Sequence, residues 1–124
     1  MEDRKPNTLP KTERLHGKTN ISELLAKGRH GNVPQMRYLF SSNGTQTNRI
    51  MISVPKKSFK RAVKRNLLKR RIRESYRKQK HTLSVNGVDV LFMYSKKEIL
   101  SYEEIFSAIG SIIERINRSA AKEA

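Results

Sequence analysis

The sequence predicts an α+β fold in which helices pack on one mostly antiparallel sheet. The first reason is that residues 35–40, 49–54 and 88–94 carry apolar side chains in alternation or in a continuous run, as strands do. The second is that apolar residues recur at helical spacing in three other segments. The third is the order of these elements, α, β, β, α, β, α, in a chain of 124 residues, a length that suits one domain.

The domain is expected to span residues 13–118. Residues 1–12 contain two prolines and few apolar groups, which predicts a flexible arm, and 119–124 are expected to be a frayed tail. The chain has no cysteine, no apolar run near the ~20 residues of a membrane span, and no signal-like stretch at its start. These features favour a soluble cytoplasmic protein that does not contact a membrane.

The first helix is predicted from its ends. Asn20, with Glu23 three residues later, has the spacing of a capping box. Gly28 predicts a stop in the left-handed conformation. Between them Ile21, Leu24 and Leu25 give an apolar face about two turns long, so this helix needs support from the rest of the fold.

A hairpin is predicted from two strands and the loop between them. Residues 35–40 and 49–54 alternate as half-buried strands do. Asn43-Gly44 lies between them and is typical of a tight hairpin turn. Pro55 ends the second strand because proline cannot donate to the ladder.

A long helix is predicted from residue 57 to about residue 80, where strong helix formers occur without glycine or proline. Its apolar residues form two rows at i, i+4 spacing, so the helix is expected to contact different neighbours along its length. The first row is Phe59, Val63 and Leu67, and the second is Leu68, Ile72 and Tyr76.

The last two elements have clear local signals. Asn86-Gly87 predicts a turn, and the nearly all-apolar run 88–94 predicts a central strand covered on both faces. Asp89 within that run is expected to have a structural role. Ser101 and Glu104 predict a second capping box, followed by a helix to about Asn117. Its core stripe is Ile105, Ile109, Ile112, Ile113 and Ile116.

Charge is concentrated on the predicted long helix and the residues just before it. Residues 56–80 hold thirteen Lys and Arg against one acid, and so account for +12 of the formal net charge of +16. A row at i, i+4 spacing consists of Arg61, Arg65, Lys69 and Arg73, with Asn66 beside it. Like charges one turn apart repel, so the row makes sense when phosphates neutralise it. The pattern predicts RNA or DNA binding, and a solvated charged face is the alternative.

Side chains that would make the protein a catalyst by itself are scarce. There is no cysteine nucleophile, no phosphate-binding glycine loop and no histidine pair at ligand spacing, so no catalytic or metal-binding residue is predicted. His16, His30 and His81 each stand alone and are expected to be solvated. Tyr38, Phe40 and Phe59 fit either base stacking or core packing.

The segment 56–74 closely resembles the signature of the bacterial ribonuclease P protein subunit. It reads Lys56-Lys57-x4-Ala62-Val63-Lys64-Arg65-Asn66-Leu67-Leu68-Lys69-Arg70-Arg71-Ile72-Arg73-Glu74 and contains the family's Arg-Asn-x-x-Lys-Arg-x-x-Arg-Glu run. Flanking matches extend the resemblance to about Leu9–Arg118. They are Lys11-x-x-Arg14-Leu15, Arg49-x-x-Ile52-Ser53-Val54, Gly87-Val88-Asp89-Val90 and Ser101-Tyr102-x-Glu104.

The resemblance implies the family's α/β sandwich, of the type of ribosomal protein S5 domain 2, with a left-handed β-α-β crossover. It implies binding to ribonuclease P RNA, one protein per RNA, and to the 5′ leader of precursor tRNA. Cleavage would be done by the RNA with its Mg²⁺, and the protein would carry no cofactor. The RNA-binding residues would be Lys56, Lys57, Arg61, Arg65, Asn66, Lys69, Arg70 and Arg73. The leader cleft would contain Lys11, Arg14, Ile21, Leu25, Tyr38, Leu39, Phe40 and Arg49.

This chain departs from the family pattern in and around the cleft. Ile21 and Leu25 stand where phenylalanines are common, and Leu39 stands at an aromatic position. Pro55 replaces a serine, and Leu67 replaces a basic residue. A more apolar cleft with weaker leader contact is therefore expected. Two alternatives stay open: an RNA-binding structural protein of ribosomal type, and a DNA-binding module with a recognition helix.

Overall fold

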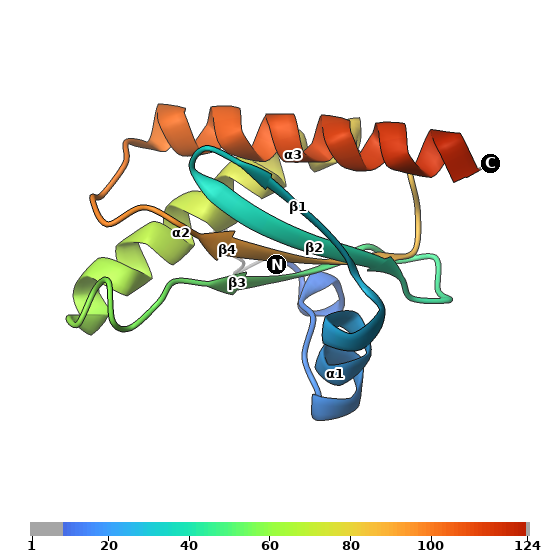
Figure 1. The fold of residues 1–124 in the computed structure, drawn as a ribbon, viewed down its shortest axis with the longest axis horizontal. Helices are drawn as coiled ribbons and strands as arrows, with labels where there is room; N and C mark the ends of the chain where they lie inside the picture. The colour runs from blue at the N-terminus through green and yellow to red at the C-terminus, as the bar shows by residue number, and fades with distance from the viewer. Residues whose placement is uncertain (1–8, 124) are drawn as a thin grey trace, which may run out of the picture.

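The computed structural model describes residues 9–123, with side chains to Ala120, so residues 1–8 of the predicted arm and Ala124 lie outside the described part. Four strands form one sheet and three α-helices pack against it (Figure 1). Along the chain the elements are α1 (Lys18–Lys27), β1 (Arg29–Val33), β2 (Met36–Ser42), β3 (Arg49–Ser53), α2 (Ala62–Gln79), β4 (Val88–Tyr94) and α3 (Tyr102–Glu123). Single 3₁₀ turns occur at Lys11–Glu13 and Lys80–Thr82.

The order of strands across the sheet is β1-β2-β4-β3. β1 pairs with β2 and β2 pairs with β4 in antiparallel fashion, whereas β3 runs parallel to β4. The unit β3-α2-β4 is the left-handed crossover that the family resemblance implies. The predicted α+β fold with a mostly antiparallel sheet is confirmed.

The predicted hairpin between residues 35–40 and 49–54 is wrong. β4 lies between β2 and β3, so these two strands are not neighbours. The hairpin of this sheet joins β2 to β1 instead, with Val33 opposite Met36 and a turn at Pro34–Gln35. The sequence 29–33, Arg-His-Gly-Asn-Val, has no apolar alternation, which is why β1 was not predicted.

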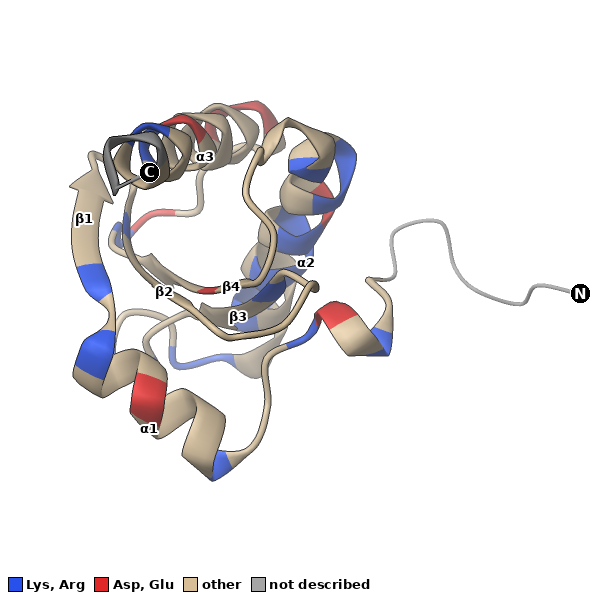
Figure 2. Cartoon of the chain, turned by 90° about the vertical axis from the view of Figure 1, so that its right-hand side faces the viewer, with Lys and Arg blue, Asp and Glu red and all other residues tan. Residues whose placement is uncertain are grey.

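The helices form two layers on opposite faces of the sheet. α2 and α3 cover one face, and α1 lies against the other (Figure 2). The main core lies under α2 and α3 and includes Leu68, Ile72 and Tyr76 together with the full isoleucine stripe of α3. A smaller cluster on the α1 face consists of Leu15, Leu24, Leu39 and Leu91. Among the described helices, none combines the length and apolar character needed to cross a bilayer.

Both predicted ends of the first helix differ from the structure. α1 begins at Lys18 after Gly17, and the predicted Asn20–Glu23 capping box is absent because Asn20 lies inside the helix and donates to the carbonyl of His16. Gly28 does end the helix, but its backbone is extended rather than left-handed. Residue 28 is a glycine for another reason: a Cβ there would lie 2.7 Å from the Leu39 side chain and 2.5 Å from the carbonyl oxygen of Leu24.

The basic helix starts later than predicted, at Ala62 rather than residue 57. Phe59 therefore precedes the helix and packs edge-on against Tyr94 in the core. Val63 is 77% exposed, so the first predicted apolar row does not form a buried face. The second row is confirmed by the complete burial of Leu68 and Ile72 and the near-complete burial of Tyr76.

The elements with the strongest local signals agree with the prediction. Gly87 has a φ of 82° in the predicted turn, and β4 spans the predicted central strand. The capping box is present: Ser101 Oγ accepts from the amide of Glu104 at 3.2 Å, and the Glu104 carboxylate accepts from the amide of Ser101 at 3.0 Å. α3 continues to Glu123, past the end predicted at Asn117.

Residues before the predicted boundary at residue 13 also belong to the fold. Leu9 is buried in the main core, and residues 11–13 form a 3₁₀ turn. The expected flexibility of the arm and fraying of the tail stay predictions.

Candidate nucleic-acid interface

The cations of α2 and its flanks are used in three different ways. The first group forms ion pairs with the few acids nearby. Glu74 pairs with Arg77 at 2.9 Å and with Lys78 at 3.4 Å, and Glu13 pairs with Lys80 at 2.7 Å. The hydrogen bond from Arg77 is the main reason that the pKa of Glu74 is below its ordinary value. These pairs neutralise the C-terminal end of the basic segment, and its other cations have no acidic partner among residues 9–120.

The second group consists of two arginines that hold backbone carbonyls. Arg65 Nη1 donates to the carbonyl oxygens of Phe59 and Lys60, at 2.7 and 2.9 Å, and so fixes the loop that precedes α2. Arg71 Nη1 donates to the carbonyl oxygen of Leu100, in the segment before α3. Both side chains are half-buried and have a structural use that the sequence did not indicate.

In the third group the side chains make no hydrogen bond or ion pair within the described part of the chain. We call it the open basic surface: Lys56, Lys57, Lys60, Arg61, Lys64, Lys69, Arg70 and Arg73. Six of these were predicted as RNA-binding residues, and Lys60 and Lys64 were not. Asn66, also predicted, is exposed on the same helix. Figure 2 shows α2 as the element on which Lys and Arg gather.

The charges of Arg14 and Arg70 act on the guanidinium group of Arg73 in α2. Burial, then the charges of Arg14 and Arg70, lowers the pKa of Arg73 below its ordinary value. Arg14 is fixed there by its backbone bridge to Ile50 of β3 and by a 3.1 Å bond from its Nε to the carbonyl oxygen of Leu9. The structure thus brings a predicted leader-cleft residue, Arg14, beside two predicted RNA-binding residues. A bound phosphate would reduce the repulsion among the three.

A pocket of about 450 Å³ lies at the start of α2 and extends the open basic surface. Its cations are Lys60, Arg61, Lys64 and Lys97, with one acid, Glu98. Lys97 comes from the segment after β4, so this part of the surface depends on the fold and has no signal in the helical pattern.

The predicted leader-cleft residues do not share one surface. Leu39 lies on the α1 face of the sheet in the cluster with Leu24, and Ile21 packs against this cluster. Tyr38 and Phe40 point to the opposite face, into the main core, so their predicted place beside α1 is wrong. The reason is the two-residue period of a strand, which puts neighbours of Leu39 on the other side. Leu25 is 57% exposed on α1.

The predicted cleft cations also separate. Lys11 and Arg14 are exposed near the β3 edge. Arg49 is not available, because its Nε and Nη2 donate to the two carboxylate oxygens of Asp89 at 2.7 and 2.8 Å. The hydrogen bond that Arg49 donates to Asp89 is the main reason that the pKa of Arg49 is raised. The structural role predicted for Asp89 is confirmed, and Arg49 shares it.

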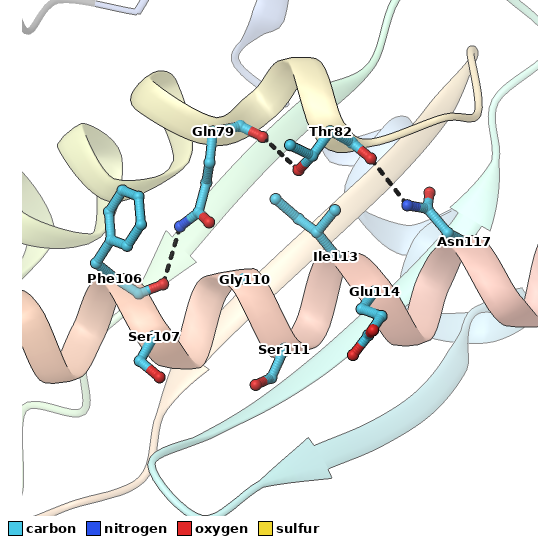
Figure 3. Close-up of a pocket in the computed structure, with 9 residues that line it drawn as sticks. All are labelled: Gln79, Thr82, Phe106, Ser107, Gly110, Ser111, Ile113, Glu114 and Asn117. Atoms are coloured by element: carbon cyan, nitrogen blue, oxygen red, sulfur yellow. Dashed lines mark hydrogen bonds between the residues drawn. The ribbon is translucent and has the colours of Figure 1, made fainter.

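A second pocket, of about 630 Å³ between α2 and α3, is lined without any Lys or Arg (Figure 3). Here Gln79 Nε2 donates to the carbonyl oxygen of Phe106 at 2.9 Å, and Asn117 Nδ2 to that of Thr82 at 2.9 Å. Gly110 lets the helices approach, since a Cβ there would lie 2.9 Å from Gln79 Oε1. These contacts join the C-terminal end of α2, and the 3₁₀ turn after it, to α3.

The three histidines are exposed, and the described residues contain no group of three His, Asp or Glu side chains placed to hold a metal ion.

Comparison with known proteins gives one consistent family. A model of the ribonuclease P family matches residues 9–117. The ribonuclease P protein component of Photobacterium profundum is 31% identical over 105 residues, which cover 85% of this chain and 88% of that protein. That of Porphyromonas gingivalis is 38% identical over 79 residues, so the chain matches only 58% of its length. The solved ribonuclease P protein of Thermotoga maritima has a TM-score of 0.74 at 26% identity, covering 83% of this chain and 96% of that one. Since the family pattern spans nearly the whole described domain and a solved member has the same fold, this chain belongs to the ribonuclease P protein family.

Proposed function

We propose that this chain is the protein subunit of ribonuclease P. In this role it binds the catalytic RNA and the 5′ leader of precursor tRNA, and assists the RNA in removing the leader with RNA-bound Mg²⁺. The proposal includes one protein per RNA, acting in the cytoplasm. The observation that carries it is the open basic surface of α2, whose cations have no acidic partners in the described chain although nearby acids pair with Arg77, Lys78 and Lys80.

The physical contribution of such a surface is counterion release. Each phosphate neutralised by Lys or Arg releases condensed cations, so RNA affinity falls with salt. If about six phosphates are engaged, log K falls against log salt with a slope of roughly −5. Positive charge held between the catalytic RNA and the precursor also screens two polyanions from each other, which lowers the Mg²⁺ concentration that their association needs.

The leader is proposed to bind on the α1 face of the sheet. Ile21 of α1 and the half-buried Met51 and Met93 give this face an apolar character. Lys11 and Arg14 provide charge at its β3 edge, next to Arg73. A leader on this face would reach the RNA bound to α2 through Arg14. The apolar lining supports weaker leader contact than stacking on aromatic rings would give.

The test is cleavage of a precursor tRNA by a bacterial ribonuclease P RNA at low Mg²⁺, with and without the protein. The double variant Lys69→Ala, Arg70→Ala removes two unpaired cations, and Lys78→Ala is the matched control because Lys78 is already paired with Glu74. We expect strong stimulation by the unchanged protein and by the control, and loss of most of it in the double variant. RNA binding without any stimulation would refute the proposal and favour a structural RNA-binding protein of ribosomal type.

A further inference from the structure

A small pocket between β1 and the last turns of α3 has the composition of an anion site. Its volume is about 350 Å³, and it is lined by Tyr38, Arg115, Arg118 and Ser119. Every one of these side chains ends in a group that can donate a hydrogen bond, and two of them are positively charged. Arg115 of this pocket donates to Asn32 of β1, and α2 lies on the other side of α3 from β1 (Figure 2). It is therefore separate from the open basic surface.

Tyr38 is the unusual member of this pocket. Its side chain belongs to the main core and is only 5% exposed, yet its hydroxyl makes no hydrogen bond within the described chain. The ring crosses Gly31, its partner on β1, and reaches the edge of the sheet there. A Cβ at residue 31 would lie 2.3 Å from Tyr38 Cζ and 2.4 Å from the hydroxyl oxygen, so glycine makes this position possible. The Tyr38 hydroxyl therefore opens into the cationic pocket with its donor free, and it can donate to an acceptor bound there.

The two arginines are positioned differently. Arg115 Nη1 donates to the carbonyl oxygen of Asn32 on β1 at 3.0 Å, which fixes its guanidinium over the strand. Arg118 is 68% exposed and has only a 3.4 Å contact with the equally exposed Glu114, a pair that water and salt weaken. One arginine is thus held in place, and the other is able to turn toward a ligand. Arginine rather than lysine suits a phosphate, which accepts two parallel N–H bonds from one guanidinium.

A neighbouring pocket of about 430 Å³ shares Arg115 and adds Arg37 and Asn32. Because the two pockets share Arg115, one extended strand with repeated phosphates can occupy both of them. A single free phosphate would use only one of them.

We propose that a phosphate group of an RNA strand binds between β1 and α3, held by Tyr38, Arg115 and Arg118. The choice of RNA as its source rests on the proposed function, whereas the phosphate site itself does not. With this site the protein contacts RNA on two sides, at α2 and at the β1–α3 edge, and is able to hold two RNA segments at once.

The test is site-resolved nuclear magnetic resonance on the full chain, first with inorganic phosphate and then with an eight-nucleotide single-stranded RNA. The backbone amides of Gly31, Asn32 and Ser119 report on the new site, and those of Lys69 and Arg70 report on α2 in the same sample. We expect saturable shifts at the new site with both probes. Tyr38→Phe, which removes only the unpartnered hydroxyl, and Arg118→Gln should each weaken binding there by roughly tenfold or more, the size expected for one charge-assisted hydrogen bond. Both should leave the α2 signals and the melting temperature unchanged.

Phosphate shifts confined to α2 would overturn the site itself. Shifts at the new site with phosphate but not with RNA would overturn the RNA assignment and leave a small anion as the ligand. Equal affinity of the wild type and both variants for phosphate at this site would also overturn it. If Tyr38→Phe unfolds, Arg118→Gln alone still provides this test. Failure of the tRNA cleavage assay, by contrast, would refute the proposed function without changing the phosphate result.

Discussion

Arg49 and Asp89 face each other across the parallel strands β3 and β4 and form an ion pair through two hydrogen bonds, at 2.7 and 2.8 Å. Asp89 has a side chain only 7% exposed, and its Oδ1 also accepts a 2.8 Å bond from Asn43 Nδ2, in the loop after β2. One carboxylate therefore ties together three segments of the sheet. This use of Arg49 explains why a residue of the family's flanking pattern does not serve as a free cation in the cleft.

The first prediction concerns this pair. Arg49→Gln should lower the free energy of unfolding by about 2–4 kcal/mol, because it leaves a buried carboxylate without its main partner. Urea denaturation measures this change, and Arg61→Gln, at an exposed and unpaired arginine, should change it by less than about 0.5 kcal/mol. If Arg49→Gln were as stable as the wild type but bound leader more weakly, Arg49 would have a leader-binding role instead of a structural one.

Two adjacent arginines of α2 provide the second prediction. Arg70 is exposed and unpaired in the described chain, whereas Arg71 donates to the carbonyl oxygen of Leu100. Arg70→Ala should weaken RNA binding and reduce the salt slope by roughly one unit without changing stability. Arg71→Ala should instead lower the free energy of unfolding by about 1–2 kcal/mol, since it leaves a carbonyl unpaired. Filter binding at several salt concentrations and thermal unfolding of both variants test these two roles. If both variants lost RNA affinity and stability to the same extent, Arg70 and Arg71 would not have different roles.

The third prediction uses another adjacent pair, on α1. Leu24→Ala should cost about 2–4 kcal/mol of stability, because Leu24 is buried in the cluster under α1 and its truncation leaves a cavity. Leu25→Ala should leave stability unchanged and weaken binding of precursor tRNA relative to tRNA without a leader, because Leu25 is exposed on α1, the helix that lies on the proposed leader face. The comparison requires affinities for both RNAs. If Leu25→Ala changed the affinities for precursor tRNA and for tRNA without a leader by the same factor, Leu25 would not belong to the leader site.

The limits of the sequence prediction have physical reasons. Signals that act within one element, such as the isoleucine stripe of α3 and its capping box, were interpreted correctly because helix periodicity and caps depend on residues three or four positions apart. Strand pairing depends on residues far along the chain. Asn43-Gly44 fits a hairpin turn locally, but β4 inserts between β2 and β3, and Asn43 bonds to Asp89 and to the carbonyl oxygen of Thr47.

In the candidate site, too, the local signals were informative and the long-range contacts were not. The resemblance and the charge count located the basic helix, but they treated its cations as equivalent. Arg65 and Arg71 differ from Arg70 because the carbonyls that they hold belong to segments before and after the helix. Lys97, in the segment after β4, lines the basic pocket. Tyr38 points away from the α1 face because neighbouring residues of a strand face opposite sides of the sheet. None of these relations is encoded in local spacing.

The last prediction concerns stability at high pH. Burial, and to a lesser extent the Glu13 carboxylate, raises the pKa of the Tyr76 phenol well above its ordinary value of 10.0. The folded state therefore keeps the neutral phenol at a pH where the unfolded chain ionises it, so this contribution to stability is complete below pH 10 and is lost as pH rises beyond it. Tyr76→Phe lacks the titrating group but keeps the ring, which is 6.0 Å from that of Phe92. Between pH 10 and 11 the wild type should lose about 1 kcal/mol more than the variant, measured by urea unfolding at each pH. Lysine deprotonation affects both proteins alike, and parallel curves for the two would show that the Tyr76 phenol titrates equally in the folded and unfolded states.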